Sequence, residues 1–550
     1  MKKFFKIFFK KIYLNVIISL AFFLPVFGGN YPFPINQDYP YGIRATNVNH
    51  NTILNLYNTW KARYVTSSGC PTGTQRVLSP EPINGYYNAT CSEGQAYGML
   101  LAVYLDDRTL FDYLYKYKQN KSASKNPSHL MPWLIDANGN IIDINSATDA
   151  DLDIAFALLM ADKQWGSGGS LNYYNLALTE IDDIRNYDIA TDNHLKPGDN
   201  WDNWTYPSYF MPAYFKVFKE VDPSHASKWD AVYTTCNNHI DIGRNDSNGL
   251  IGEILNTNGT ARTDDPCSSS CDGRKYKYNS CRVPWRYAME YVWHGVDPVN
   301  EVSLLAAFFN GIGASNVKDG YWVSSGASEG PYHNAAFTGP AGCALMRSST
   351  YQTQLNNFYQ ETISFNVTES YYNGTLQLLS LLLMSGNFHN LRAMGTPQPT
   401  ATATPVPLGE MLDNFEDNNS QNLWGGYWYT YKADGVVQST VWPAGGTTFT
   451  PSAPGAASTL YAGRITGYVA PQSGSYYPCV GMGTQMVENE DGVRDVSAFT
   501  GIRFWAKGDG TSEYSIRFVP SNVTNTGYND YKFSFIPPAT WTQFAIPFTS

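Results

Sequence analysis

The chain has 550 residues, of which 43% are hydrophobic and 15% aromatic, and its formal net charge is −10 at pH 7. This length predicts more than one domain, and the hydrophobic fraction is large enough for a sizeable core, so global disorder is excluded. No basic run follows the N-terminal segment, which argues against a nucleic acid or an anionic membrane as partner.

Residues 1–29 are typical of a secretory signal peptide. Lysines precede the apolar stretch "VIISLAFFLPVF", which is too short to span a bilayer comfortably, and small residues follow at Val26 and Gly28. No later segment resembles a transmembrane helix. We therefore expect a secreted, extracellular protein that makes no membrane contact after cleavage and is a monomer.

The eight cysteines of an exported chain favour disulfides. Their pairing cannot be deduced from sequence, and at least one of the seven before residue 395 must stay unpaired. No CxxC pair or HExxH motif supports a metal site, so we predict neither a metal nor a cofactor. The cysteines are Cys70, Cys91, Cys236, Cys267, Cys271, Cys281, Cys343 and Cys479.

The stretch "GTPQPTATATPVP", residues 395–407, is a Pro/Thr linker that favours extended backbone. It divides a domain of residues 30–394 from a second domain of residues 408–550.

The first domain is predicted to be mostly helical. In "SEGQAYGMLLAVYLDD" apolar residues recur at helical spacing, and Ser92 with Gln95 forms a capping box that starts the helix at Glu93. In "SATDADLDIAFALLMADKQW" Thr148 is the expected N-cap, which places Asp149 in the first turn. The stretches "NEVSLLAAFFNGIG" and "TLQLLSLLLMSG" indicate further buried helices. The pattern indicates an all-α barrel or solenoid.

The second domain is predicted to be an all-β sandwich. The stretches "GIRFWAKGDG", "EYSIRFVPS", "YKFSFIPP" and "TQFAIPFTS" alternate apolar and polar residues between turn signals, as strands do. The chain ends on an apolar strand, so this domain is expected to be cut short.

Glu93 and Asp149 are the candidate catalytic carboxylates. Acids in a first helical turn are ordinarily explained by the helix macrodipole, which they favour by ~0.3–1 kcal/mol. Asp149, however, lies in a cluster with Asp151 and Asp153, and clustered carboxylates raise one another's pKa. A general acid needs a raised pKa, so a catalytic Glu93 must lie in a dry pocket or against another carboxylate.

At these residues the sequence resembles glycoside hydrolase family 8. "CSEGQAYGMLLAV" and "ATDADLDIAFALLMADKQW" are similar to its two hallmark stretches, and the second fits the family signature at every constrained position. The similarity extends over residues 35–390 and includes "YPSYFMPAYFKVF", "YNSCRVPWR" and "HNAAFTGP". The resemblance implies an (α/α)6 barrel that cleaves β-1,4 linkages with inversion.

The resemblance also implies roles for single residues. Glu93 matches the general acid, and Asp149 matches a carboxylate that holds and distorts the sugar at the cleaved position. Arg282 and Arg286 are expected to support the cleft, although Arg286 could equally be structural. The candidates for sugar stacking or water positioning are Trp133, Trp201, Trp204 and Tyr209, and for Trp201 and Trp204 core packing is nearly as plausible.

Asn279 departs from the family pattern, because many members carry the general base, an Asp, three residues before this Arg. A subgroup with Asn there, which includes lichenases and chitosanases, takes its base from a nearby loop acid. The preceding loop offers Asp272 as first choice, then Asp265 and Asp264, although none is the Glu that this subgroup would suggest.

The second domain resembles a family 11 type carbohydrate-binding module, a jelly-roll sandwich, from "LDNFED" to "WTQFAIPF". The acidic start "DNFEDN" could instead bind a structural Ca²⁺, which we do not predict.

Two functions remain open. The first is a secreted inverting endo-β-1,4-glycanase that acts on cellulose or mixed-linkage β-glucan, with chitosan or xylan as the substrate alternatives. The second is a non-catalytic glycan-binding protein that lost its base at Asn279. In both cases the expected partner is a β-linked polysaccharide.

Overall fold

The computed structural model divides the chain into two compact units, residues 28–398 and residues 1–27 with 399–550. It describes residues 14–19, 29–125, 127–264, 266 and 271–394, and parts of 412–547. The predicted linker and most of the predicted signal peptide lie outside these residues. None of the helices among them is long and apolar enough to cross a bilayer.

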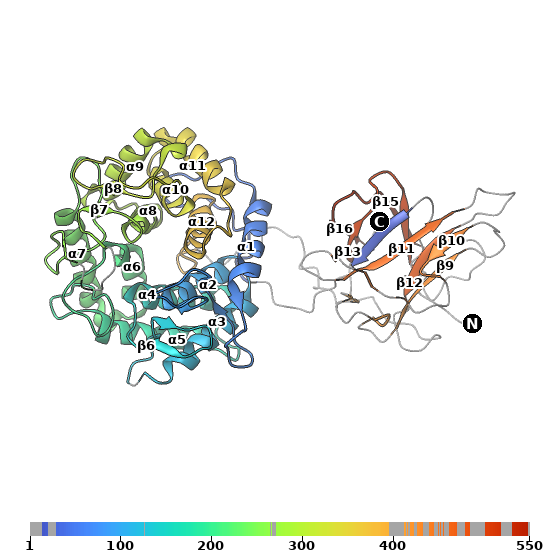
Figure 1. The fold of residues 1–550 in the computed structure, drawn as a ribbon, viewed down its shortest axis with the longest axis horizontal. Helices are drawn as coiled ribbons and strands as arrows, with labels where there is room; N and C mark the ends of the chain where they lie inside the picture. Colours follow the sequence, from blue (N-terminus) through green and yellow to red (C-terminus); the bar gives the residue numbers. More distant parts are fainter. Residues whose placement is uncertain are drawn as a thin grey trace. The chain divides into compact units, whose positions relative to one another are not determined.

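The helical unit holds twelve α-helices in its described residues, and they form two concentric rings (Figure 1). The inner ring closes on itself, since α12 packs against α2, and each outer helix packs on an inner one. The inner helices are α2 (Ser92–Tyr104), α4 (Thr148–Trp165), α6 (Pro212–Val221), α8 (Val283–His294), α10 (Ala335–Ala344) and α12 (Tyr371–Met384).

The outer helices each bury one face only, because their other face meets solvent. They are α1 (His50–Tyr64), α3 (Arg108–Ser122), α5 (Tyr173–Asp183), α7 (Ala226–Gly243), α9 (Glu301–Ile312) and α11 (Gln352–Ser364). Between the helices lie short strands, namely β2 (Val65–Thr66), β3 (Arg76–Val77), β4 (Thr90–Cys91), β5 (Leu134–Ile135), β6 (Ile141–Asp143), β7 (Lys275–Tyr276) and β8 (Tyr321–Trp322).

The predicted helices exist, but both predicted N-caps are wrong. Helix α2 begins at Ser92 with Cys91 as N-cap, and α4 begins at Thr148 with Ala147 as N-cap. The side chain of Gln95 accepts from the Val77 N–H at 3.0 Å instead of closing a capping box, and Thr148 Oγ1 donates to the Lys196 carbonyl at 2.7 Å. Tertiary partners replaced the local ones, because both residues are fully buried among other elements.

The β-rich unit contains the four predicted strands and further ones. Its described strands form a five-stranded sheet in the order β10-β11-β1-β13-β16, and the pairs β9–β12 and β14–β15. The jelly-roll order stays a prediction. The strands are β1 (Leu14–Ser19), β9 (Trp428–Lys432), β10 (Thr440–Trp442), β11 (Gly463–Tyr468), β12 (Val480–Thr484), β13 (Gly501–Lys507), β14 (Tyr514–Phe518), β15 (Tyr531–Phe535) and β16 (Thr542–Pro547).

Strand β1 lies within the segment predicted as a signal peptide. It pairs antiparallel with β11 and with β13. A chain that had lost residues 1–29 would therefore lack the strand that lies between β11 and β13 in the sheet.

The predicted disulfides do not include Cys70, Cys91, Cys236, Cys281 or Cys343, which carry free thiols. Cys236, Cys281 and Cys343 are buried on separate helices or turns, while Cys70 and Cys91 are partly exposed. Cys343 Sγ contacts the Ser380 carbonyl, and Cys281 Sγ contacts the Tyr278 carbonyl. Cys267 lies outside the described residues.

Candidate active site

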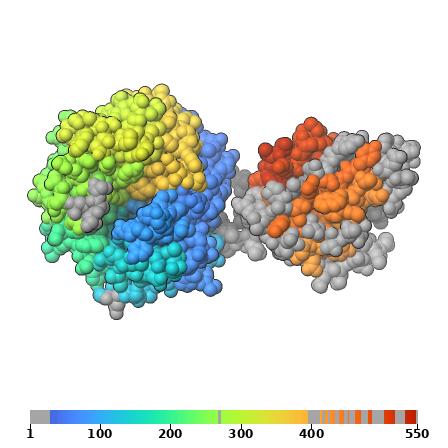
Figure 2. Space-filling view, in the orientation of Figure 1, coloured from blue at the N-terminus to red at the C-terminus, as the bar shows by residue number. Residues whose placement is uncertain are grey.

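A cavity of about 430 Å³ opens where the N-terminal ends of α2, α4 and α12 converge with the segment before α8. In Figure 2 the blue residues that contain α2 meet the yellow residues that contain α12 on this unit. The cavity is lined by Ser79, Glu81, Ile83, Cys91, Ser92, Glu93, Trp133, Ala147, Asp149, Tyr209, Asn279, Arg282, Ser370, Tyr371 and Tyr372.

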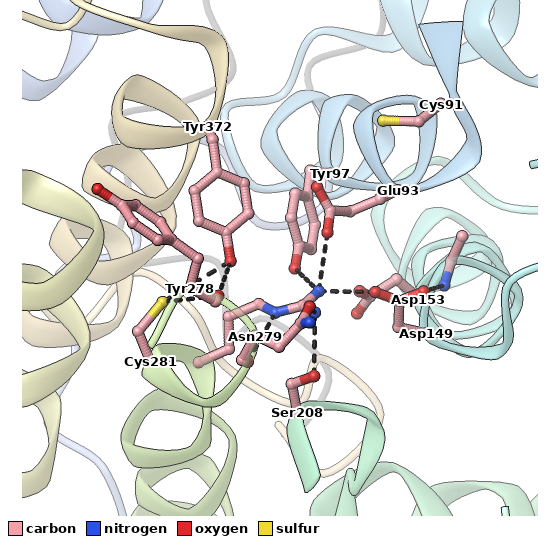
Figure 3. Close-up of polar contacts among 12 residues, drawn as sticks. Cys91, Glu93, Tyr97, Asp149, Asp153, Ser208, Tyr278, Asn279, Cys281 and Tyr372 are labelled. Carbon is pink, nitrogen blue, oxygen red and sulfur yellow. Dashed lines mark hydrogen bonds and ion pairs between the residues drawn. The ribbon is translucent and has the colours of Figure 1, made fainter. Parts of the chain in front are cut away.

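Arg282 binds both predicted catalytic carboxylates through one nitrogen. Its Nη1 donates to Glu93 Oε2 at 2.9 Å, to Asp149 Oδ2 at 2.6 Å and to the Tyr97 hydroxyl at 3.0 Å. Its Nη2 donates to Ser208 Oγ at 3.0 Å. Figure 3 shows the contacts of these four partners converging on one guanidinium. Arg282 thus positions Glu93 and Asp149 side by side.

Glu93 has the raised pKa that a general acid needs. Its pKa is raised to about 7, first by burial and then by the charge of Asp149, while the charge of Arg282 acts in the opposite direction. Its other oxygen, Oε1, accepts from the Tyr371 hydroxyl at 3.1 Å. Both conditions expected of a catalytic Glu93, a dry pocket and a second carboxylate, are therefore present.

Asp149 is held in place by its own helix as well as by Arg282. Its Oδ1 accepts from the Ala150 N–H at 2.9 Å, and the residue is 2% exposed. One turn further along α4, Asp153 forms a two-pronged ion pair with Arg286 at 2.7 and 2.5 Å. Arg286 is fully buried and does not line the cavity, so it supports the wall behind the two carboxylates.

Of the predicted aromatic residues, Trp133 and Tyr209 line the cavity, and Trp201 and Trp204 do not. The indole N–H of Trp133 is buried and has no hydrogen-bond partner among the described residues. Trp201 and Trp204 belong to a small hydrophobic cluster with Ile254 that also contacts Tyr209. They therefore support the cavity wall.

Asn279 lines the cavity at the place where the resemblance would put a carboxylate. Its side-chain oxygen accepts from Arg282 Nη2 at 3.4 Å, and its Nδ2 donates to Cys271 Sγ at 2.9 Å. The amide is thus fixed by contacts on both of its ends.

The predicted loop acids are not brought to the cavity. Arg274 binds both oxygens of Asp272, at 2.9 and 2.8 Å, and these hydrogen bonds lower the pKa of Asp272. Asp264 is exposed and pairs with Arg262 at 2.7 Å. Asp265 lies outside the described residues. Neither described acid is among the residues that line the cavity.

Sequence reasoning missed Glu253, which lies in the loop between α7 and α8. Its Oε1 accepts from the backbone N–H of Asn279 at 3.2 Å and its Oε2 from that of Asp272 at 3.4 Å. It is 5% exposed, and burial raises its pKa to about 7. The signal was a Glu inside the apolar run "LIGEIL", where a charge is unexpected without a partner or a task.

No group of three or more His, Cys, Asp or Glu residues that could hold a metal ion occurs in the part of the chain that the structure describes. At the acidic start of the β-rich unit, Asp413 accepts from the indole N–H of Trp428 and from the Phe415 N–H. The other acids of "DNFEDN" lie outside the described residues.

Comparisons with known proteins agree with this fold. Residues 31–386 match the family described as glycosyl hydrolases family 8. Endoglucanase 2 of Ruminiclostridium josui is 37% identical over 374 residues, which cover 66% of this chain and 77% of that protein. The beta-glucanase of Niallia circulans is 34% identical over 409 residues, covering 68% and 94%. The apo structure of a beta-1,3-1,4-glucanase from Paenibacillus sp. X4 is 33% identical with a TM-score of 0.60, covering 66% and 99%.

Fold and site together define a glycoside hydrolase. The chain belongs to glycosyl hydrolase family 8. Members of this family are (α/α)6 barrels, so the predicted barrel is confirmed for the helical unit, and the alternative of a non-catalytic protein is not supported.

Proposed function

We propose that this enzyme is an endo-β-1,4-glucanase that hydrolyses cellulose or mixed-linkage β-glucan with inversion. The observation that carries the proposal is a protonatable Glu93 that shares one guanidinium with Asp149 inside an open cavity. Two of the relatives are named an endoglucanase and a beta-glucanase, which favours glucan over chitosan or xylan as the substrate.

A reducing-sugar assay on carboxymethylcellulose, barley β-glucan, chitosan and xylan tests the substrate. The proposal requires the first two to be cleaved fastest. NMR of the first-formed product tests the stereochemistry, since inversion gives the α anomer. A β anomer, or a preference for chitosan or xylan, would contradict the corresponding part of the proposal.

In the proposed mechanism Glu93 donates its proton to the bridging oxygen as the glycosidic bond breaks. Asp149 accepts hydrogen bonds from the sugar on the other side of that bond and stabilises its distorted form. The guanidinium of Arg282 donates hydrogen bonds to both Asp149 and Glu93, and so orients the two carboxyl groups toward the same point. The ring of Trp133, which lines the cavity, offers an apolar surface to a sugar.

For the general base we propose Glu253 in place of Asp272. An inverting enzyme needs a second carboxylate ~6.5–9.5 Å from the acid to leave room for water. Glu253 does not line the cavity either, but it accepts from the backbone N–H of Asn279, which does. Asp272, in contrast, is bound by Arg274, which holds its pKa low. A pKa of about 7 suits a base that works near neutral pH. The fixed amide of Asn279 would orient the attacking water.

Azide rescue of alanine variants tests the assignment, because a small anion can replace a lost base. Glu253→Ala should lose activity and regain part of it with azide, while Asp272→Ala and Asp264→Ala stay near wild type. If Glu253 only anchors the loop, azide restores nothing, and Glu253→Gln keeps more activity than Glu253→Ala, since its amide oxygen can accept one of the two N–H bonds. A sharp gain in Asn279→Asp would mean that the natural enzyme lacks an efficient base.

We also propose that the β-rich unit binds glycan through a row of tyrosines on β9. Tyr427, Tyr429 and Tyr431 alternate with buried Trp428, and their ring centroids are 6.2 and 6.3 Å apart. Tyr429 and Tyr431 pair with Gly483 and Gly481 of β12, so no side chain of these partners covers their rings. Aromatic faces of this kind suit the apolar faces of sugar rings.

Retardation in native gels that contain β-glucan tests this row. The full chain with Glu93→Gln, which cannot digest the gel, serves as reference. Adding Tyr429→Ala and Tyr431→Ala should abolish retardation, whereas Trp442→Ala, an exposed aromatic on β10, should not. If Trp442→Ala abolished retardation and the two tyrosine substitutions did not, the glycan-binding site would lie at Trp442 and not at the row of tyrosines.

A further inference from the structure

The cavity contains a third carboxylate, Glu81, which the mechanism above does not use. Glu81 belongs to a hairpin whose backbone bridges join Ser79 to Ala89 and Ile83 to Tyr86. Ser79, Glu81 and Ile83 all line the cavity, so this hairpin forms one of its walls.

The carboxylate of Glu81 is exposed, and its position is fixed. Its Oε2 accepts from the backbone N–H of Tyr371 at 3.3 Å and from Ser79 Oγ at 3.2 Å. Both of these bonds fall on Oε2, so among the described residues the charge is held at the cavity wall with an oxygen that can still accept.

The hydrogen bonds of Glu93 connect Asp149 to one of its oxygens and Glu81 to the other. Oε2 of Glu93 shares Arg282 with Asp149, and Oε1 accepts from the Tyr371 hydroxyl. Tyr371 in turn donates its backbone N–H to Glu81. The residues therefore run in the order Asp149, Arg282, Glu93, Tyr371, Glu81.

This order assigns sides to the two sugars that flank the cleaved bond. Glu93 protonates the oxygen between them, and Asp149 holds the sugar whose anomeric carbon is attacked by water. The sugar that departs with the bridging oxygen must then lie on the side of Tyr371 and Glu81.

We propose that Glu81 binds the leaving sugar by accepting a hydrogen bond from one of its hydroxyl groups. The inference rests on the proposed function of Glu93 and Asp149. A hydroxyl-to-carboxylate hydrogen bond is charge-assisted and stronger than a neutral one. The interaction requires a leaving group with hydroxyls, which distinguishes it from a structural role.

Two substrates with different leaving groups test the proposal. Cello-oligosaccharides depart with a sugar on the Glu81 side, whereas aryl cello-oligosaccharides that release a nitrophenol present no hydroxyl there. Glu81→Ala should lower kcat/KM on the oligosaccharides about tenfold to a hundredfold and leave release of the nitrophenol unchanged. Glu81→Gln, which keeps an acceptor oxygen, should lose less.

Glu369→Gln is the matched control, since Glu369 is also exposed, immediately precedes the N-cap of α12 and does not line the cavity. It removes the same charge and should leave both substrates unchanged. Equal losses on both substrates in Glu81→Ala overturn the proposal. A loss on the oligosaccharides that comes with a shifted alkaline limb of the pH–rate profile overturns it too, because Glu81 would then act through Tyr371 on Glu93. No loss on either, or a loss confined to glucosamine oligosaccharides, overturns it as well. A wild-type enzyme inactive on every glucan would instead refute the proposed function.

Discussion

The pKa of Glu93 sets the pH above which the enzyme is expected to lose activity. Burial raises this pKa to about 7 although Arg282 pulls the other way. Since the acid must enter the reaction protonated, kcat/KM on soluble β-glucan should fall about tenfold per pH unit above pH ~7. A pH–rate profile from pH 4 to 10 measures this. A profile that stays flat up to pH 9 would remove Glu93 from the role of acid.

Glu93→Gln should be nearly inactive yet more stable than wild type at alkaline pH. The amide cannot protonate the leaving oxygen, so turnover should fall by about 10²–10⁴-fold. A carboxyl whose folded pKa is raised gives stability that is complete below its unfolded pKa of about 4.5 and is lost as pH rises through about 7. The amide does not titrate, so the variant should gain ~3 kcal/mol at pH 8 and nothing at pH 4.

Thermal unfolding of Glu93→Gln at these two pH values checks the sign of the effect. An equal change in melting temperature at both would show that the substitution altered packing and not ionisation. Binding of cello-oligosaccharides should persist, because the other cavity residues remain.

Asp149→Asn should separate rate from binding. Its proposed contact strengthens as the sugar distorts, so activity should fall by about 10²-fold or more while affinity for short glucans changes little. Asp153→Asn is the informative comparison, since it breaks the buried pair with Arg286 and should cost about 3–5 kcal/mol of folding stability. If Asp149→Asn loses stability alone, Asp149 is only a structural residue of α4.

Sequence reasoning proposed Glu93 and Asp149 because both lie beside a recognisable helix start, and the structure places them on one guanidinium. It passed over Glu253, whose proposed role depends on a contact with Asn279, 26 residues away. It chose Asp272 for its closeness in sequence, but the side chain pairs with Arg274 two residues on. Whether Asp272 pairs with a neighbour in sequence or reaches the cavity depends on the folded structure, which the sequence alone does not give.

At the scale of elements, the apolar period of 3.6 residues was enough to predict α2 and α4, and alternation was enough for β13 to β16. The caps were wrong because Gln95 and Thr148 face buried neighbours from other elements. Periodicity averages over a whole helix, whereas a cap depends on one side chain and its tertiary partners.

The loop that presents Glu253 depends on a close approach of two backbones. A Cβ on Gly252 would lie 1.9 Å from the Gly273 carbonyl oxygen, so even a methyl group must push the two segments apart. Gly252→Ala should therefore displace the hydrogen bonds from Asn279 and Asp272 to Glu253, lower activity at least about tenfold and reduce stability by ~1–3 kcal/mol.

Gly311→Ala provides the control for this loop, since a Cβ there meets nothing within 4 Å and the residue lies in helix α9. Alanine favours a helix interior over glycine, so this variant should be unchanged or slightly stabilised. Activity assays and thermal unfolding of both variants decide the matter. A Gly252→Ala enzyme with normal activity would mean that the Glu253 contact does not serve the reaction.

At the scale of the whole molecule, every residue named in the cavity belongs to the helical unit, which has its own large core. The β-rich unit has a separate core around Phe415, Trp428 and Phe504. Hydrolysis by the helical unit and glycan binding by the β-rich unit should thus be separable. The predicted linker between them, residues 395–407, was visible in composition alone, because it lacks the apolar residues that a core needs.

Truncation after Thr400 should leave hydrolysis of soluble β-glucan within twofold of the full chain and weaken action on insoluble cellulose by about tenfold. A tethered binding unit raises the local concentration of enzyme on a solid surface, but it adds nothing where substrate diffuses freely. Initial rates on both substrates, at equal enzyme concentration, measure the ratio. Restoring the unit with Tyr429→Ala and Tyr431→Ala should reproduce the truncated enzyme, since the row of tyrosines is what the tether is proposed to deliver. Equal rates of all three forms on cellulose would deny the β-rich unit a binding role.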